Sequence, residues 1–228
     1  MLSQYKAYIF DLDGTLYDNR RIGFNLVRRD LFHILYIKGE RMARKMLRGV
    51  EFSSKDEFYE HFFKEASTEA GVPVDIYTSW YEKKYRDVLT RTLKHSYKGH
   101  SEAVDVFRKL HDNGAKVAVY SDYCGVEDRM SALKLPPKSV DYLFDAEEFG
   151  ALKPAKAPFL KIAGILGQSP EDILVIGDRT DTDGKGAKMS GMNFVHINDR
   201  LAQVGQSNVD GKAYPAMSWK QFAEEILG

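Results

Sequence analysis

The sequence predicts an α/β fold, in which a parallel sheet flanked by helices carries an inserted, all-helical unit. Short apolar segments alternate with longer amphipathic ones, a pattern typical of right-handed crossovers between parallel strands. The first apolar segment is followed by about ninety residues with helical spacing before the next strand signal appears. We expect the strands near residues 6–11, 115–120, 141–144, 172–177 and 193–197.

The sequence indicates where the helices between and after these strands begin or end. Helix 101–113 ends at an Asn-Gly pair, where glycine readily takes the left-handed conformation that closes a helix. Helix 158–166 is expected to have Pro158 at its first position. The last helix is expected to begin with a capping box from Ser218 to Gln221.

The long helical stretch, residues 18–97, is predicted to be a separate bundle of about four helices. The core then consists of residues 1–17 and 98–228. Both links leave the core near the end of the first strand, so the insert is expected to lie above that end of the sheet. Four apolar residues at near-helical spacing mark its first part: Ile22, Leu26, Leu31 and Leu35.

The composition excludes several classes of partner. Lys plus Arg and Asp plus Glu both total 33, so nothing global attracts nucleic acid or an anionic membrane. No apolar stretch is long enough to span a bilayer, and the first residues lead into a strand without a signal-peptide pattern. The single cysteine, Cys124, permits no internal disulfide and is expected to be a packing residue. We therefore expect a cytoplasmic protein; nothing in the sequence indicates its oligomeric state.

Three predicted strands end on polar residues that a phosphate-handling site would use. These residues are Asp11, Ser121 and Asp178. The carboxyl ends of parallel strands meet at one edge of the sheet, where open α/β sheets bind their ligands. Asp13 follows Asp11 by one strand period, so the two carboxylates could share a face, and Gly14 then allows a turn. The sequence therefore predicts a cluster of carboxylates at this edge.

The negative charge of such a cluster limits the ligands that it can bind. Two carboxylates about 4 Å apart repel by about 4 kcal/mol at an effective dielectric constant near 20. A phosphate dianion adds to this repulsion, so the cluster needs a cation or some protonated carboxylates. All-oxygen ligands and an anionic substrate favour Mg²⁺. Lys153 could add a fixed positive charge, Ser121 could donate a hydrogen bond to a phosphoryl oxygen, and Thr15 can hydrogen-bond the local backbone.

These residues carry a resemblance to a known family. The run Asp11-Leu12-Asp13-Gly14-Thr15 resembles the first motif of the haloacid dehalogenase-like hydrolase superfamily. Ser121, Lys153 and the run 177–183 resemble its second, third and fourth motifs, in the right order. The helical insert is placed and sized like the helical cap of that superfamily. The resemblance implies a Rossmann-like core with a cap between the first and second motifs.

The resemblance also implies roles for the matching residues. Asp11 would be the nucleophile and form an aspartyl-phosphate. Asp13 would protonate the leaving alkoxide and then activate water, which requires a raised pKa for the Asp13 carboxyl. Ser121 and the backbone N–H of Asp122 would bind the phosphoryl oxygens, and Lys153 would steady the nucleophile and the developing charge.

The resemblance further implies a metal site. Mg²⁺ would be held by the Asp11 carboxylate, the backbone carbonyl of Asp13 and Asp178. Asp183 best matches the second acid of the fourth motif and would support the metal indirectly. Asp181 is a nearer acid that could take this role instead, and either residue could merely cap the following helix.

The function expected on these grounds is Mg²⁺-dependent hydrolysis of a small phosphorylated metabolite through an aspartyl-phosphate. A phosphomutase, a 2-haloacid dehalogenase and a catalytically silent phospho-ligand-binding relative are the alternatives. Dehalogenases resemble the first motif but lack the second aspartate, so Asp13 favours phosphate chemistry. A mutase must protect its aspartyl-phosphate from water, and no feature of the sequence demands this. A basic cluster in the insert is read as a solvated face: Arg20, Arg21, Arg28 and Arg29.

Overall fold

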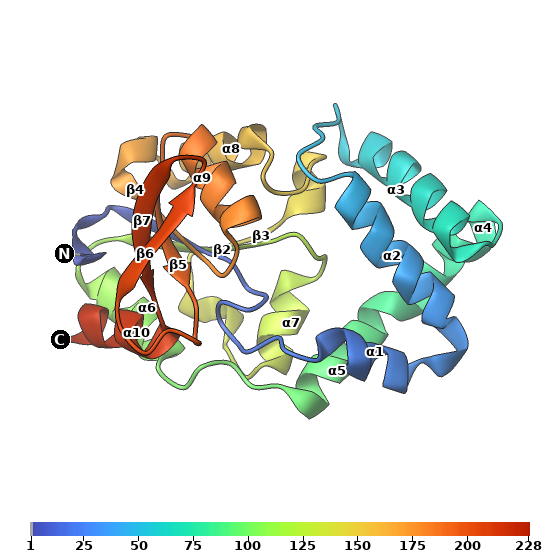
Figure 1. The fold of residues 1–228 in the computed structure, drawn as a ribbon, viewed down its shortest axis with the longest axis horizontal. Coiled ribbons are helices and arrows are strands. Elements are labelled where there is room, and N and C mark those ends of the chain that lie inside the picture. The colour runs from blue at the N-terminus through green and yellow to red at the C-terminus, as the bar shows by residue number, and fades with distance from the viewer. Residues whose placement is uncertain (1) are drawn as a thin grey trace.

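The computed structural model describes residues 2–228 and contains one seven-stranded sheet with the strand order β3-β2-β1-β4-β5-β7-β6 (Figure 1). The five strands expected from the sequence are present and pair in parallel. They are β1 (Ala7–Phe10), β2 (Lys116–Ser121), β3 (Tyr142–Asp145), β4 (Ile173–Gly177) and β5 (Asn193–Ile197). The expected α/β fold class is therefore confirmed.

Two further strands extend the sheet at one edge. They are β6 (Gly205–Val209) and β7 (Lys212–Met217). β7 continues the parallel order beside β5, whereas β6 pairs with it in antiparallel fashion. The turn between them is Asp210-Gly211, with φ of 46° and 88°. An Asp-Gly pair suits a two-residue hairpin turn, which needs positive φ at both positions, so the sequence does contain a local signal for this hairpin.

Helices cover both faces of the sheet. Tyr8 and Phe10 of β1 pack on one face with α6 (Ala103–Asp112), α7 (Val126–Ala132) and α10 (Trp219–Leu227). Ala7 and Ile9 of β1 pack on the other face with α8 (Lys156–Leu166) and α9 (Lys185–Met189). Alternate residues of a strand point to opposite faces, and both sets are buried. The central strands are therefore apolar on both sides, as a sheet covered on two faces requires.

Two of the expected helix starts are wrong by about two residues, and one is confirmed. α6 begins at Ala103, after a cap residue that makes no side-chain hydrogen bond. α8 begins at Lys156, which puts Pro158 at the third position; proline is tolerated there because N–H groups of the first turn have no intrahelical partner. The capping box between Ser218 and Gln221 at the start of α10 is present.

The first five helices after β1 gather beside the sheet, at the right of Figure 1. They are α1 (Ile22–Arg29), α2 (Ile34–Met46), α3 (Lys55–Ala70), α4 (Val74–Trp80) and α5 (Arg86–Ser96). A π-helical segment, Tyr81–Tyr85, joins α4 to α5 without a break. These elements, called the helical unit below, thus form four helical rods. The remaining elements are a second π-helical segment, Thr180–Gly184, and short 3₁₀ turns: Leu2–Gln4, Leu31–His33, Pro137–Ser139, Ala146–Phe149 and Pro170–Asp172.

The apolar spacing at the start of the helical unit does not describe one continuous helix. The chain leaves the helical conformation at Asp30, with φ −137° and ψ 67°. The helical phase is therefore lost before α2 begins, and Leu31 and Leu35 are 64% and 55% exposed rather than buried. Ser54 does cap α3, because its side chain accepts a hydrogen bond from the Glu57 backbone N–H.

The two links between the helical unit and the sheet lie side by side. The rings of Tyr17 and Tyr97 meet edge to face, with centroids 5.5 Å apart. The Tyr97 hydroxyl donates to the Arg20 carbonyl at 3.0 Å and accepts from the Asn25 side chain at 2.9 Å. Within residues 2–228, none of the helices combines the length and the apolar character needed to cross a membrane.

Candidate active site

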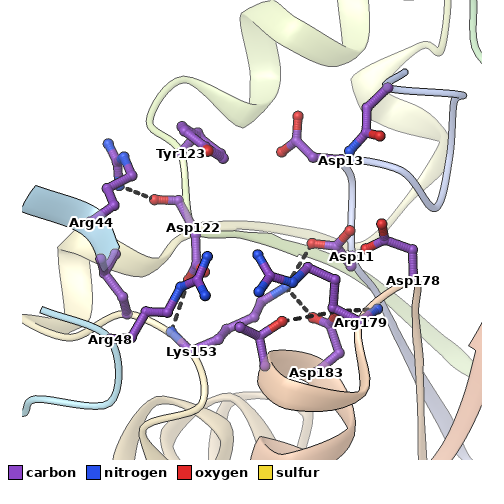
Figure 2. Close-up of a pocket in the computed structure, with 13 residues that line it drawn as sticks. Asp11, Asp13, Arg44, Arg48, Asp122, Tyr123, Lys153, Asp178, Arg179 and Asp183 are labelled. Atoms are coloured by element: carbon purple, nitrogen blue, oxygen red, sulfur yellow. Dashed lines mark hydrogen bonds and ion pairs between the residues drawn. The ribbon is translucent and has the colours of Figure 1, made fainter. Parts of the chain in front are cut away.

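A cavity of about 100 Å³ lies where β1, β2 and β4 end, between the sheet and the helical unit (Figure 2). Its volume suits a phosphoryl group with a few waters, whereas whole ligand pockets usually exceed about 300 Å³. Six residues predicted for the site line it: Asp11, Asp13, Asp122, Lys153, Asp178 and Asp183.

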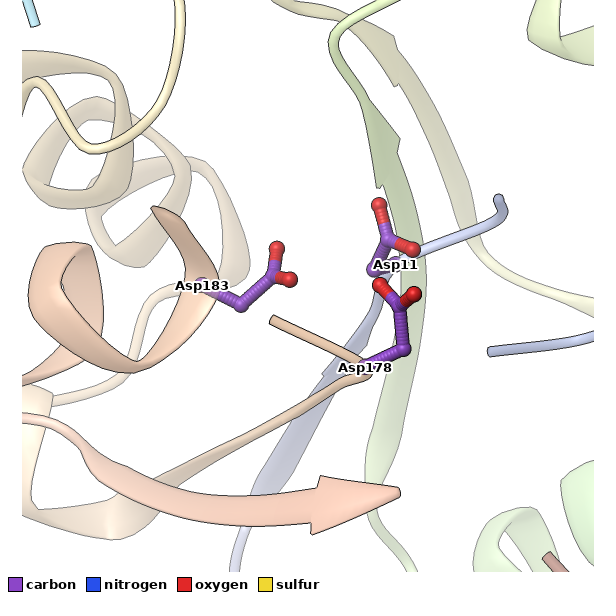
Figure 3. Close-up of side chains that lie close together, drawn as sticks. All are labelled: Asp11, Asp178 and Asp183. Carbon is purple, nitrogen blue, oxygen red and sulfur yellow. The ribbon is translucent and has the colours of Figure 1, made fainter. Parts of the chain in front are cut away.

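Three of these acids form a compact cluster (Figure 3). Asp11, Asp178 and Asp183 each offer a carboxylate oxygen, and these oxygens lie within 4.8 Å of one another. Gly14 permits the close approach, because its φ is 94° and a Cβ there would lie 2.3 Å from an Asp178 oxygen. Gly177 does the same for Asp183, since its Cβ would lie 2.4 Å from the Asp183 carboxyl carbon.

The positive charges around the cluster do not balance the negative charge of its carboxylates. Burial and the neighbouring Asp183 carboxylate raise the pKa of Asp178 to about 7. Burial also raises the pKa of Asp11, although the Lys153 ammonium opposes the shift. A small divalent cation with a preference for carboxylate oxygens would relieve this repulsion. The residues present therefore fit Mg²⁺.

Lys153 joins the nucleophile candidate to the rest of the cluster. Its ammonium donates to Asp11 Oδ1 at 2.7 Å, to Asp183 Oδ1 at 2.7 Å and to the Tyr120 carbonyl at 2.8 Å. Burial disfavours its charge, but the two carboxylates raise the pKa of Lys153 well above its ordinary value. The Thr15 hydroxyl donates to Asp11 Oδ2 at 3.0 Å. Both oxygens of Asp11 are thus held, and Thr15 binds this side chain in addition to any role in the turn.

Asp13 lies apart from the acid cluster. It forms a buried ion pair with Arg129, and it accepts hydrogen bonds from the Tyr17 hydroxyl at 2.6 Å and the Ser121 hydroxyl at 2.9 Å. Burial alone would raise the pKa of Asp13, but Arg129 and these hydroxyls lower it below its ordinary value. The raised pKa expected for Asp13 is therefore not found in this conformation, because a buried arginine stabilises the carboxylate.

The two residues expected to bind phosphate are also engaged with protein groups. Ser121 is fully buried; its hydroxyl donates to Asp13 and accepts from Arg129 Nη1 at 3.0 Å. The Asp122 carboxylate accepts the backbone N–H of Lys153 at 2.8 Å, which ties the second motif to the third. The Asp122 carbonyl accepts a hydrogen bond from Arg44 of α2 (Figure 2).

The structure separates the two acids that the sequence left as alternatives. Asp183 is 2% exposed and lies in the cluster with Asp11 and Asp178. The Asp181 side chain is 60% exposed and pairs with Arg179 at 2.5 Å and with Arg48 at 3.5 Å. Asp183, and not Asp181, is thus brought to the candidate metal site.

Several cavity residues were not identified from the sequence. Arg44 and Arg48 reach the cavity from α2 and the turn after it, whereas the basic cluster noted in the sequence between Arg20 and Arg29 does not line it. Arg44 is buried, with Glu40 and Glu147 as ion-pair partners. A Glu–Arg pair four positions apart on an otherwise apolar helix face was a usable signal. Arg129 carried a similar one, because it lies between Val126 and Met130 on the buried side of α7.

Comparison with known proteins gives a family and a fold. Residues 5–191 match the haloacid dehalogenase-like hydrolases. A glyceraldehyde 3-phosphate phosphatase from Methanothermobacter thermautotrophicus is 24% identical over 214 residues, which cover 90% of this chain and 91% of the relative. A phosphoglycolate phosphatase from Aquifex aeolicus is 27% identical over 212 residues, covering 82% and 81%.

Solved structures of both phosphatases and dehalogenases share the fold. A HAD phosphatase from Thermococcus onnurineus superposes with a TM-score of 0.62 at 22% identity, covering 98% of each chain. An L-2-haloacid dehalogenase from Xanthobacter autotrophicus gives a TM-score of 0.59 at 17% identity, covering 87% of this chain and 79% of its own. The fold alone therefore does not distinguish attack on phosphorus from attack on carbon; the site residues must do so.

Proposed function

The chain belongs to the haloacid dehalogenase-like hydrolase family, and we propose that it is a Mg²⁺-dependent phosphatase acting on a small phosphorylated metabolite through an aspartyl-phosphate. Its relatives are named as phosphatases, which supports a phosphoric monoester hydrolase. The observation that carries the proposal is the Asp11–Asp178–Asp183 cluster, held on one side by the Lys153 ammonium.

Asp11 is oriented for nucleophilic attack. Lys153 and Thr15 each hold one of its carboxylate oxygens, so the side chain has little freedom to rotate. In the proposed first step, an Asp11 oxygen bonds to phosphorus and the ester P–O bond breaks. Water then attacks phosphorus, releases inorganic phosphate and restores the Asp11 carboxylate.

Asp13 is proposed to donate the proton to the leaving alkoxide and to take one from the attacking water. In this conformation Asp13 is paired with Arg129 and hydrogen-bonded to Tyr17. The proposal therefore requires the Asp13 side chain to exchange Arg129 for the leaving group when substrate binds. Ser121 loses its acceptor in the same movement, and its hydroxyl becomes free to donate to a phosphoryl oxygen.

Mg²⁺ would be held by the carboxylates of Asp11 and Asp178 and the backbone carbonyl of Asp13. Asp183 would support the metal indirectly. Bound there, the cation supplies positive charge that offsets the repulsion between the phosphate and the carboxylates. The chain's own cation, Lys153, is already shared between Asp11 and Asp183. It leaves Asp178 without an ammonium partner, which supports the need for a second positive charge.

We further propose that residues 18–97 act as a cap over the core formed by residues 1–17 and 98–228. Arg44 and Arg48 of the helical unit line the cavity together with the core carboxylates, which supports this arrangement. The small cavity favours a compact phosphate ester. The named substrates of the relatives, glyceraldehyde 3-phosphate and phosphoglycolate, are of this size class.

The first test is release of phosphate from p-nitrophenyl phosphate. We expect turnover with Mg²⁺, loss of turnover with excess EDTA, and recovery when Mg²⁺ is restored. Replacement Asp11→Asn should abolish turnover, because an amide is a poor nucleophile. Metal-independent hydrolysis of 2-chloropropionate, with no phosphate release under any condition, would instead show a dehalogenase.

A further inference from the structure

A second cavity, of about 540 Å³, adjoins the candidate active site along α2. The two cavities share Arg44, Arg48, Tyr123 and Arg179 in their linings, so they are separated by no more than these side chains. The two cavities differ in charge. Five aspartates and four cations line the first, whereas none of the described residues that line the second is acidic. The charged residues of the second cavity, called the basic groove below, are Lys38, Arg41, Arg44, Lys45, Arg48 and Arg179.

Three cations of the basic groove are uncommitted. Arg44 is fully engaged with Glu40, Glu147 and the Asp122 carbonyl, and Arg179 pairs with Asp181. By contrast, Lys38, Arg41 and Lys45 are exposed and make no ion pair or side-chain hydrogen bond within residues 2–228. Arg48 has one weak contact, at 3.5 Å, with the already paired Asp181.

The three uncommitted cations form one row with Arg48. Lys38, Arg41, Lys45 and Arg48 follow one another at intervals of three, four and three positions, which places them along one face of α2 and the turn after it. Like charges at this spacing repel one another and weaken a helix. The whole chain has equal numbers of acidic and basic residues, so the row is a local feature rather than a consequence of composition. A row of this kind that ends at an active site raises the local concentration of anions there.

We propose that the basic groove binds a second anionic group of the substrate, so that the natural substrate is a phosphate ester with a further carboxylate or phosphate. This inference rests on the proposed function, because the scissile phosphate is taken to lie beside Asp11. Arg48, which lines both cavities, marks the passage between the two anions. Lys38, Arg41 and Lys45 then determine specificity without touching the reacting atoms.

Calorimetry with non-hydrolysable ligands in Mg²⁺ buffer tests this inference. The probes are propylphosphonate, with one anionic group, and two-anion series in which propane, butane or pentane bridges join a phosphonate to a carboxylate or to a second phosphonate. At least one two-anion ligand should bind about tenfold more tightly than propylphosphonate, a difference of about 1.4 kcal/mol. The series that gains affinity shows which second group the groove accepts.

A groove variant and a charge-matched control complete the experiment. The groove variant combines Lys38→Gln, Arg41→Gln and Lys45→Gln. The control combines Lys83→Gln, Lys84→Gln and Lys94→Gln, which removes the same charge from exposed positions elsewhere in the helical unit. The groove variant should lose the two-anion preference and change its affinity for propylphosphonate by less than about twofold. The control should keep the preference.

Equal affinity of the wild-type protein for one-anion and two-anion ligands would overturn the inference, as would equal loss of the preference in both variants. Neither result bears on the proposed function, which is tested by phosphate release from p-nitrophenyl phosphate. Conversely, absence of that release would overturn the proposed function, whereas the calorimetric comparison would still decide whether the groove binds a second anion.

Discussion

Two buried cations form ion pairs with different carboxylates of the site. Lys153 holds Asp11 and Asp183, whereas Arg129 holds Asp13. Asp11 and Asp13 are only two positions apart, yet their charges are stabilised by different elements. Burial raises the pKa of Asp11 and a cation lowers that of Asp13, so the two side chains are already differentiated before substrate binds.

Replacing Asp183 or Asp181, two neighbouring acids, should have very different effects on kcat/KM. Replacement Asp183→Asn removes a buried carboxylate that hydrogen-bonds the Lys153 ammonium, so kcat/KM should fall by about tenfold to a hundredfold. Replacement Asp181→Asn is the matched control, because this side chain is mostly exposed and pairs only with arginines. It should change kcat/KM by less than about threefold. Steady-state kinetics in which Asp181→Asn is the more damaging change would reverse our assignment.

Residue types at strand ends were predictable, but the partners of these residues were not. Asp11, Asp178 and Lys153 follow from the motifs, and the structure brings them together as expected. Arg44 and Arg129 were missed because their importance depends on tertiary packing that no local pattern encodes. The lowered pKa of Asp13 was missed for the same reason, because its partner Arg129 is 116 positions away in the chain.

Residues at the ends of the strands stabilise the sheet as well as forming the candidate active site. Asp141, just before β3, accepts the Val117 backbone N–H at 2.8 Å, and its own N–H donates back to Val117. His111 and Lys116 add side-chain contacts. Partial burial of Asp141 opposes its charge, but these hydrogen bonds lower its pKa below the ordinary value. Asp141 therefore ties the edge strand β3 to β2.

The Asp141 interaction should make stability depend on pH. A lowered pKa in the folded state contributes stability that is present above the unfolded pKa, near about 3.9, and is lost as pH falls through the folded pKa. Replacement Asp141→Asn should lower the free energy of unfolding by about 0.5–1 kcal/mol at neutral pH, a modest value because the side chain is largely solvated. Urea unfolding at decreasing pH should show this difference shrink; a constant difference would contradict the charge-based explanation.

A cross-link tests whether the helical unit moves. Lys55 of α3 and Glu148, after β3, form an exposed ion pair between the helical unit and the core. A bismaleimide joining cysteines at these two positions should lower turnover by about tenfold or more if the unit must open to admit substrate. The native Cys124 is a poor competitor, because burial raises its pKa to about 11. Single-cysteine variants treated alike are the controls, and undiminished turnover of the cross-linked protein would exclude the movement.

The positions of five parallel strands were predictable because each is a short apolar run. The β6–β7 hairpin was missed because its strands are polar on their exposed positions and lack such runs. The break at Asp30 was missed because apolar spacing alone does not show where a backbone leaves the helical conformation.

If the Asp11–Asp178–Asp183 cluster binds Mg²⁺, as proposed, metal binding should stabilise the whole molecule. A cation that binds only the folded protein stabilises it by about 2.7 kcal/mol at a hundred times its Kd. For a chain of this length that corresponds to about 5–10 °C in Tm. We expect Mg²⁺ to raise Tm by this amount, and Asp178→Asn to abolish the rise while Asp181→Asn keeps it. A Tm independent of Mg²⁺ would contradict the assignment of the cluster as a metal site.

The central claim is that Asp11 forms an aspartyl-phosphate during turnover. Borohydride reduces an acyl phosphate to the alcohol, so quenching the working enzyme with it should convert this side chain to that of homoserine. Peptide mass spectrometry should then find homoserine at position 11 only when substrate and Mg²⁺ are both present. An unmodified Asp11 during sustained phosphate release, or the modification at another aspartate, would contradict the account.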